Sequence, residues 1–336
     1  MDRTFPSRTP LASSRRGFTI TELLVAIGII VLLIGILLPA LGKVLQRAKA
    51  TQTASSMQEF SKACDAFQQE FGFYPGLVPE DILANDPKIT GTENAILHLC
   101  GGGIDQNDPL YANPPGGSTG WTEITFGSGA SQFKIKVNPS RVGTGPRIAG
   151  KEYPPFFAPK ASELTPTTGQ VAQSGAPSSL VLPDLLDAWG QPIIYLRGMR
   201  ETGPLVGNGT TGQYALSPTL GYVMSSPGAE ESDVVGLGDL GKDQAPSLFR
   251  SASNPNETLA QILRNPAFGA RDKPLDGTPA GRYVLISAGP DGVYYSKFDG
   301  LGTPAVPKTD IVSATANPAG PEIVSKYDDV RVFGGG

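Results

Sequence analysis

Hydrophobic residues follow two different patterns along the first 71 positions. From Phe18 to Pro39 nearly every residue is apolar, and none between Leu23 and Leu38 is charged. About 20 consecutive apolar residues are enough for a helix to span a bilayer. We therefore expect a transmembrane helix over residues 18–40.

The second pattern is a stripe on one face of a helix. Apolar side chains recur at steps of three and four residues, and a Gly-x-x-Pro stop signal, Gly72 to Pro75, follows them. We expect the helix to continue over residues 41–71 and to pack this stripe on a globular part. Pro39 lacks a backbone donor and is expected to kink or locally unwind the helix. The stripe consists of Met57, Phe60, Cys64, Phe67 and Phe71.

Residues 72–336 read as a globular head of mixed type. ENAILHLCGG (93–102) predicts a short helix ended by glycines. Residues 101–183 are rich in Gly, Pro, Ser and Thr and predict a loop-rich insertion with some paired strands, at 121–126 and 133–137. The expected fold class is α+β, with the long N-terminal helix packed on a small antiparallel sheet.

One acid interrupts the apolar run. A carboxylate in a membrane helix costs about 2.5–3.5 kcal/mol at the bilayer centre and less near an interface. Glu22 therefore needs a partner. An ordinary single-pass anchor fits the length of the run but leaves Glu22 unexplained, and an ordinary secretory signal has a shorter apolar core with its small-residue cleavage site after that core.

The arrangement Arg-Arg-Gly-Phe at 15–18 with Glu22 and Pro39 resembles the N-terminus of type IV pilins and type II secretion pseudopilins. The resemblance implies a leader of residues 1–17, removed by a prepilin peptidase that cuts after Gly17. Phe18 becomes the N-methylated first residue and Glu22 the fifth. It also implies that Glu22 pairs with the Phe18 amine of a neighbouring copy, so that the chain joins other pseudopilins in a filament.

Charge indicates which side of the membrane each part occupies. The leader has four arginines and one acid, Asp2, and the positive-inside rule keeps such a segment cytoplasmic. Of 27 basic and 31 acidic residues, the first fifty positions hold seven and two, which leaves 20 and 29 and a net charge of −9 for the exported part. Nucleic-acid binding needs a basic surface, so we expect no nucleic-acid partner.

Three further segments resemble the major pseudopilin of type II secretion, the protein G type. They are DAWGQPIIYLR (187–197), RYVLISAGPDG (282–292) and KYDDVRVF (326–333), and GFYPG (72–76) resembles the exit from the family's long helix. The first predicts a turn and a strand at 193–196, and the second a strand running into a Gly-Pro-Asp-Gly turn.

In that family the loop between the last two segments binds Ca²⁺. The resemblance implies Asp291, Asp328 and Asp329 as candidate ligands, since Ca²⁺ takes six to eight oxygen ligands. Asp328 lies 37 positions after Asp291, which is longer than the family loop, and Asp299 and Asp310 in between are alternatives. The other interpretation is aspartates that support turns.

We find no pattern that predicts an enzyme. The single histidine, His98, lies in an apolar run, and Cys64 and Cys100 lack metal-ligand spacing. In an oxidising compartment the two cysteines form either a disulfide or two buried thiols.

The expected function is a structural subunit of a type II secretion pseudopilus. Its partners would be prepilin peptidase, other pseudopilins, secretion platform proteins and the inner membrane, with the head in the periplasm. Two alternatives stay open: a true type IV pilin for adhesion, motility or DNA uptake, and an exported binding domain on a pilin-like anchor. The chain is about twice the usual length of the major subunit, which leaves a minor subunit open as well.

Overall fold

The computed structural model describes residues 19–129, 132–164, 182–216, 255–265, 275–296, 324 and 327–335. It is a mixed α and β structure with a long N-terminal helix and small antiparallel sheets, as expected from the sequence. The chain divides into two compact units, Met1–Ala48 and Lys49–Gly336. We call the second of these the head unit.

The helix α1 (Ile20–Phe71) runs unbroken through Pro39, so the expected local unwinding there is absent from this described stretch. It ends where the sequence predicts. Gly72 follows with a φ of +82° and donates its amide to the Gln68 carbonyl at 2.7 Å. Glycine takes this left-handed conformation without the steric cost that a Cβ brings.

The central sheet of the head unit has the strand order β6-β7-β8, with β6 at Ile194–Arg197, β7 at Tyr283–Ser287 and β8 at Val330–Gly334. Both pairings are antiparallel. Each strand comes from one of the three segments that resemble the major pseudopilin. β7 is buried at every position because both faces of the sheet are covered.

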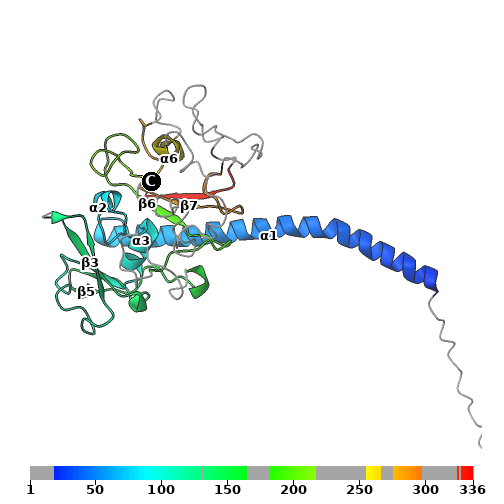
Figure 1. Cartoon of the computed structure of the whole chain (residues 1–336), viewed down its shortest axis with the longest axis horizontal. Helices are drawn as coiled ribbons and strands as arrows, with labels where there is room; N and C mark the ends of the chain where they lie inside the picture. The colour runs from blue at the N-terminus through cyan, green and yellow to red at the C-terminus, as the bar shows by residue number, and fades with distance from the viewer. Residues whose placement is uncertain are drawn as a thin grey trace, which may run out of the picture. The chain divides into compact units, whose positions relative to one another are not determined.

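Side chains that alternate along the sheet enter two different hydrophobic clusters. Ile194, Leu196, Val284 and Ile286 pack with α6 (Pro255–Leu263), whereas Tyr195, Tyr283 and Leu285 pack with α1 and α3. Alternation of this kind follows from the two-residue period of a strand. Figure 1 shows α6 on one side of β6 and β7 and α3 with the head-unit part of α1 on the other.

The predicted stripe of α1 is buried. Met57, Phe60, Cys64 and Phe67 are fully covered by the cluster that contains Tyr195 and Leu285, and Phe71 packs at its margin. The prediction from the three-and-four spacing is confirmed.

Two short helices follow α1. They are α2 (Glu80–Asn85) and α3 (Gly91–Leu99), which starts two residues before the predicted position. The reason is a capping box: the Thr90 hydroxyl accepts from the Glu93 amide, and the Glu93 carboxylate accepts from the Thr90 amide. This reciprocal pair satisfies two donors at the helix start.

The described part of the insertion has a core of its own. The strands β1 (Gly103–Asp105), β2 (Thr122–Phe126) and β3 (Phe133–Val137) form a sheet in the order β1-β3-β2, and its inner side chains cover α2 and α3. A small hairpin joins β4 (Arg147–Ile148) to β5 (Lys151–Glu152). Two single 3₁₀ turns are at Pro139–Arg141 and Ala161–Glu163.

Candidate functional site

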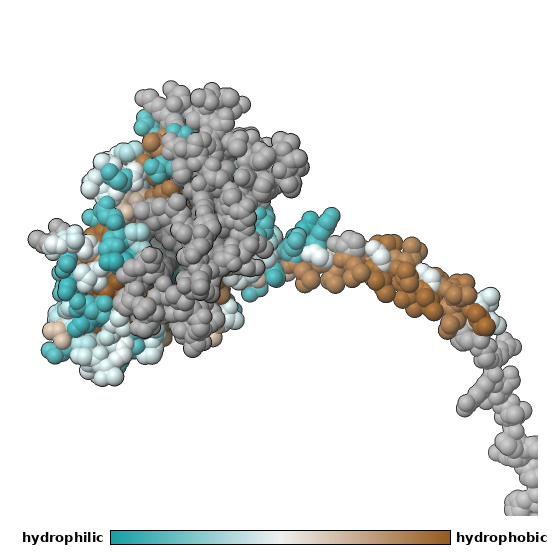
Figure 2. Space-filling model, viewed as in Figure 1, coloured by the Kyte–Doolittle hydropathy of each residue, from teal (hydrophilic) through white to brown (hydrophobic). Residues whose placement is uncertain are grey.

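The first half of α1 is the most apolar exposed surface among the described residues. Each large hydrophobic side chain from Ile20 to Leu45 is exposed by 48–79 %. Figure 2 shows this part of the helix almost entirely in the hydrophobic colour. Of the described helices, α1 is the one long and apolar enough to cross a membrane. An apolar surface of this extent on a single helix marks a membrane or protein contact.

Glu22 lies in the first turn of this helix and has a local partner. Its Oε2 accepts hydrogen bonds from the Thr19 amide at 2.8 Å and from the Thr19 hydroxyl at 2.7 Å, and the Glu22 amide donates to that hydroxyl at 3.3 Å. Thr19 and Glu22 thus have the spacing and both reciprocal contacts of a capping box. The sequence Thr-x-x-Glu carries this signal, and our sequence analysis missed it. Gly17 and Phe18 lie outside the described residues.

The turn before β6 is tied to the end of β7 by one aspartate. Asp187 Oδ1 accepts from the amides of Trp189 and Gln191 at 2.8 and 2.9 Å, and its Oδ2 accepts from the Ser287 hydroxyl at 2.7 Å. Burial raises the pKa of the Asp187 carboxyl above its ordinary value, and these hydrogen bonds offset only part of the rise. Asp187 therefore orders the predicted turn and links two segments 100 residues apart.

The candidate calcium ligands lie around the turn that follows β7. Asp291 Oδ1 accepts from the Val293 amide at 2.8 Å, and both oxygens of Asp329 lie 3.0–3.1 Å from the Tyr295 amide. Asp328 lies beside Gly289: a Cβ on this glycine would be 2.6 Å from the Asp328 carbonyl oxygen. The chain thus brings Asp328 and Asp329 back to the turn that holds Asp291, despite their separation.

These contacts fit turn support as well as metal binding. Among the residues that the structure describes, no three or more His, Cys, Asp or Glu side chains form a group able to hold a metal ion. The amide contacts of Asp291 and Asp329 are those of aspartates that stabilise turns. The alternative ligands Asp299 and Asp310 lie outside the described residues. Calcium binding at this turn stays a prediction.

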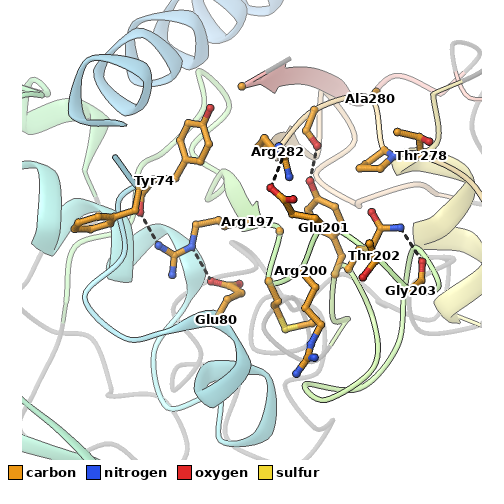
Figure 3. Close-up of a pocket in the computed structure, with 18 of the residues that line it drawn as sticks. Tyr74, Glu80, Arg197, Arg200, Glu201, Thr202, Gly203, Thr278, Ala280 and Arg282 are labelled. Carbon is orange, nitrogen blue, oxygen red and sulfur yellow. Dashed lines mark hydrogen bonds and ion pairs between the residues drawn. The ribbon is translucent and has the colours of Figure 1, made fainter. Parts of the chain in front are cut away.

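A pocket in the head unit has a volume of about 1160 Å³. Its walls are the segment that follows α1, the residues after β6 and those before β7 (Figure 3). Arg282 and Glu201 form an ion pair of 3.1 Å at the exposed rim, and Arg197 and Glu80 lie on the opposite wall at 3.6 Å. The pocket is polar and carries charges of both signs, so it favours no simple anion or cation.

His98 and the two cysteines have structural surroundings. His98 Nδ1 accepts from the Gly76 amide at 3.1 Å, and burial lowers the pKa of the imidazole to about 3. The ring is therefore neutral at physiological pH. Cys64 and Cys100 are buried free thiols, and Cys100 Sγ donates to the Phe157 carbonyl at 3.2 Å. The structure thus contains two buried thiols rather than a disulfide between Cys64 and Cys100.

Comparison with known proteins identifies no relative of this chain. No protein-family model, no curated protein and no solved structure matches the chain.

Proposed function

We propose that this chain is a structural, non-enzymatic filament subunit of the type II secretion pseudopilus kind. Its leader is removed after Gly17 by a prepilin peptidase, and α1 anchors it in the inner membrane with the head in the periplasm. One observation carries the proposal. A single carboxylate, Glu22, lies in the first turn of α1, five positions after Gly17, and the exposed apolar run that follows it from Leu23 to Leu38 is uncharged.

Two features of the head unit support a filament subunit. The second half of α1 is buried on one stripe only, so its other face stays available beside the apolar half. The three segments that resemble the major pseudopilin also form one antiparallel sheet against that helix. A helix with one face fixed to a head can polymerise through the rest of its surface.

The contact between Glu22 and Thr19 sharpens the test of assembly. Glutamine also completes a capping box, because its side-chain oxygen accepts the same amide hydrogen. Glu22→Gln thus keeps the helix start and removes the charge, whereas Glu22→Ala removes both. If Glu22 pairs with the Phe18 amine of a neighbour, both variants should insert and be processed to a chain beginning at Phe18, yet form few filaments.

Filament yield by electron microscopy and the N-terminus by mass spectrometry should be scored separately in native membranes. Normal filaments from Glu22→Gln would show that assembly uses the helix cap rather than the charge. A mature chain that keeps residues 1–17 would falsify the whole assignment.

Two other functions are alternatives to the secretion role. A type IV pilin for adhesion, motility or DNA uptake shares the N-terminal features, and so does an exported binding domain on a pilin-like anchor. The neighbouring genes separate them: a secretion ATPase, a secretin and a platform protein favour the secretion role.

A further inference from the structure

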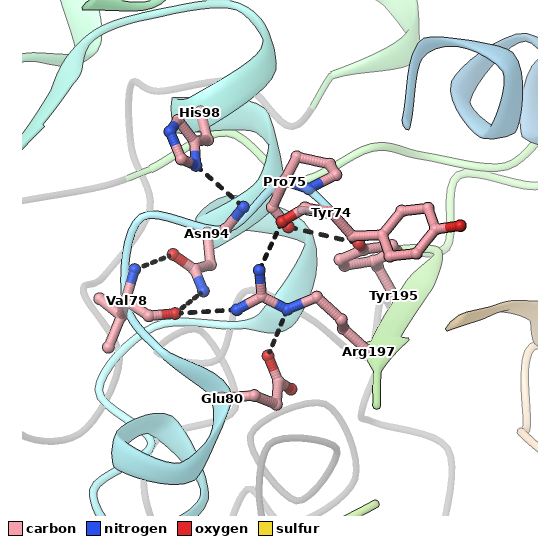
Figure 4. Close-up of polar contacts among 9 residues, drawn as sticks. Tyr74, Pro75, Val78, Glu80, Asn94, His98, Tyr195 and Arg197 are labelled. Atoms are coloured by element: carbon pink, nitrogen blue, oxygen red, sulfur yellow. Dashed lines mark hydrogen bonds and ion pairs between the residues drawn. The ribbon is translucent and has the colours of Figure 1, made fainter. Parts of the chain in front are cut away.

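Arg197, at the end of β6, holds the segment that connects α1 to α2. Its Nη1 donates to the Tyr74 carbonyl at 2.6 Å and its Nη2 to the Val78 carbonyl at 3.3 Å. Figure 4 shows the guanidinium surrounded by this segment. The segment contributes only carbonyl oxygens to these contacts, and one acid also lies within ion-pair distance of the guanidinium.

That acid is Glu80, the first residue of α2. Its side chain is 4 % exposed, and its Oε2 lies 3.6 Å from Arg197 Nε. The separation exceeds the 2.7–3.2 Å of a good hydrogen bond. The other oxygen, Oε1, is buried without a hydrogen-bond partner among the described residues. One distant cation and a backbone hydrogen bond from Arg197 compensate this buried carboxylate poorly for its lost hydration.

The balance of these effects favours a neutral carboxyl. Burial, the largest effect, raises the pKa of Glu80 from an ordinary 4.5 to about 7, while Arg197 opposes the rise and Asp81 adds to it. Glu80 therefore changes charge close to neutral pH.

The other titratable groups around Glu80 keep one charge state in this range. Burial raises the pKa of Tyr195 on β6 and of Tyr214, and it lowers the pKa of His98 on α3 to about 3. These three side chains are neutral at pH 5–8. Within this cluster, Glu80 is thus the group whose ionisation changes between pH 5 and pH 8.

We propose that Glu80 is a proton-operated latch between the segment after the long helix and β6. Protonated Glu80 keeps residues 74–85 docked beside Arg197, and ionised Glu80 weakens that docking. Glu80 lines the large pocket, so a small opening of the segment exposes the carboxyl to water. The inference is independent of the proposed filament role.

The sign of the effect follows from linkage. A carboxyl with a higher pKa in the folded than in the unfolded chain makes the folded state bind more protons. Its contribution to stability is complete below pH 4.5, falls as the pH rises towards 7 and is lost above that. The head should consequently be more stable in mild acid.

The experiment compares melting temperatures of the full chain in detergent micelles between pH 5 and pH 8.5. Glu80→Gln mimics the neutral carboxyl, and Asp81→Asn removes an exposed acid from the next position of the same helix as the control. Other buried acids, such as Glu93, are unchanged, so their effect cancels in the difference from the wild type. Glu80→Gln should melt like the wild type at pH 5 and several degrees higher at pH 8.

A local measurement tests the latch itself. The Leu83 amide bonds to the Pro79 carbonyl in α2, and the Cys100 amide bonds to the Ile96 carbonyl in α3. The ratio of their hydrogen-exchange protection should fall as the pH rises in the wild type and in Asp81→Asn, and stay constant in Glu80→Gln. A melting difference that does not change with pH overturns the proposal, as does failure of Glu80→Gln to fold at pH 5.

Discussion

The two halves of α1 share one helical backbone and differ in what their side chains contact. In residues 20–45 hydrophobic side chains occur on every face and are exposed, whereas in residues 53–67 they occupy one stripe and are buried. A helix that is apolar all round must be surrounded by lipid or by other helices. A helix with one apolar stripe needs only one covering surface, and the head supplies it. The difference teaches that one element can serve two environments through its pattern alone.

The largest expected effect is on the stability of the head, which a substitution in the buried half of α1 should lower and one in the exposed half should not. Phe60 is fully buried and makes edge contacts with Phe157 and Tyr195 at 5.1 and 5.6 Å between ring centroids. Phe60→Ala should destabilise the head by about 3–5 kcal/mol, because it removes a buried ring and leaves a cavity. Leu33→Ala, on the apolar half, should leave the stability of the head unchanged. Chemical denaturation of the full chain in micelles measures the free energy of unfolding of both variants. Equal losses would contradict the conclusion that only the second half of α1 stabilises the head.

Calcium should act on the head and leave the apolar half unaffected. If Asp291 and the pair Asp328–Asp329 bind Ca²⁺ in the folded state only, a hundredfold excess over Kd stabilises the protein by about 2.7 kcal/mol. The melting temperature in millimolar Ca²⁺ should exceed that in chelator. Mg²⁺ should have less effect because it demands tighter octahedral geometry.

Asp291→Ala provides the control for this measurement. It should abolish the difference between Ca²⁺ and chelator. If the wild-type curves with and without Ca²⁺ superimpose, the three aspartates are turn residues and the calcium prediction is wrong.

The smallest effect should come from the polar edge of the buried stripe. The Tyr283 hydroxyl lies 2.7 Å from Ser61 Oγ, and its single hydrogen is within reach of two acceptors, the Ser61 carbonyl at 2.9 Å and Asp65 Oδ1 at 3.1 Å. Tyr283→Phe should cost about 0.5–1.5 kcal/mol, the usual net value of a buried hydrogen bond. Tyr111→Phe, whose hydroxyl bonds to the exposed Glu123, is the matched control and should cost less. Equal losses in denaturant titrations would mean that the hydroxyl of Tyr283 does not fasten α1.

The sequence predicts those parts of the fold that depend on local patterns. The stripe from Met57 to Phe71 follows from the helical period, and Gly72 marks the end of α1 because of its backbone freedom. The turns of the segments at 187–197 and 282–292 follow from Gly and Pro positions. Both capping boxes are also local, at Thr19–Glu22 and Thr90–Glu93, and were readable from Thr-x-x-Glu.

Contacts between distant segments were not predictable in this way. Arg197 donates a hydrogen bond to the Tyr74 carbonyl across 123 positions. Every residue has a backbone carbonyl, so the residue type at position 74 does not reveal this acceptor. In the sequence Glu80 resembles an ordinary surface acid at the start of α2, since only the three-dimensional packing buries it. The return of Asp328 and Asp329 to the turn of Asp291 came from the resemblance, while the partners of each carboxylate required the structure.

The strand order β6-β7-β8 has a consequence for how the protein folds during its synthesis. The third strand of this sheet, Val330–Gly334, is far from α1 in the sequence, and the Tyr283 hydroxyl contacts Ser61 across 222 positions. During synthesis the aromatic stripe of α1 therefore stays uncovered until β6 and β7, which lie far downstream in the sequence, have been made. Such late, long-range closure is slow and exposes apolar surface to aggregation. A nascent chain of this protein should thus depend on a holding chaperone until the strands that cover the stripe have been made.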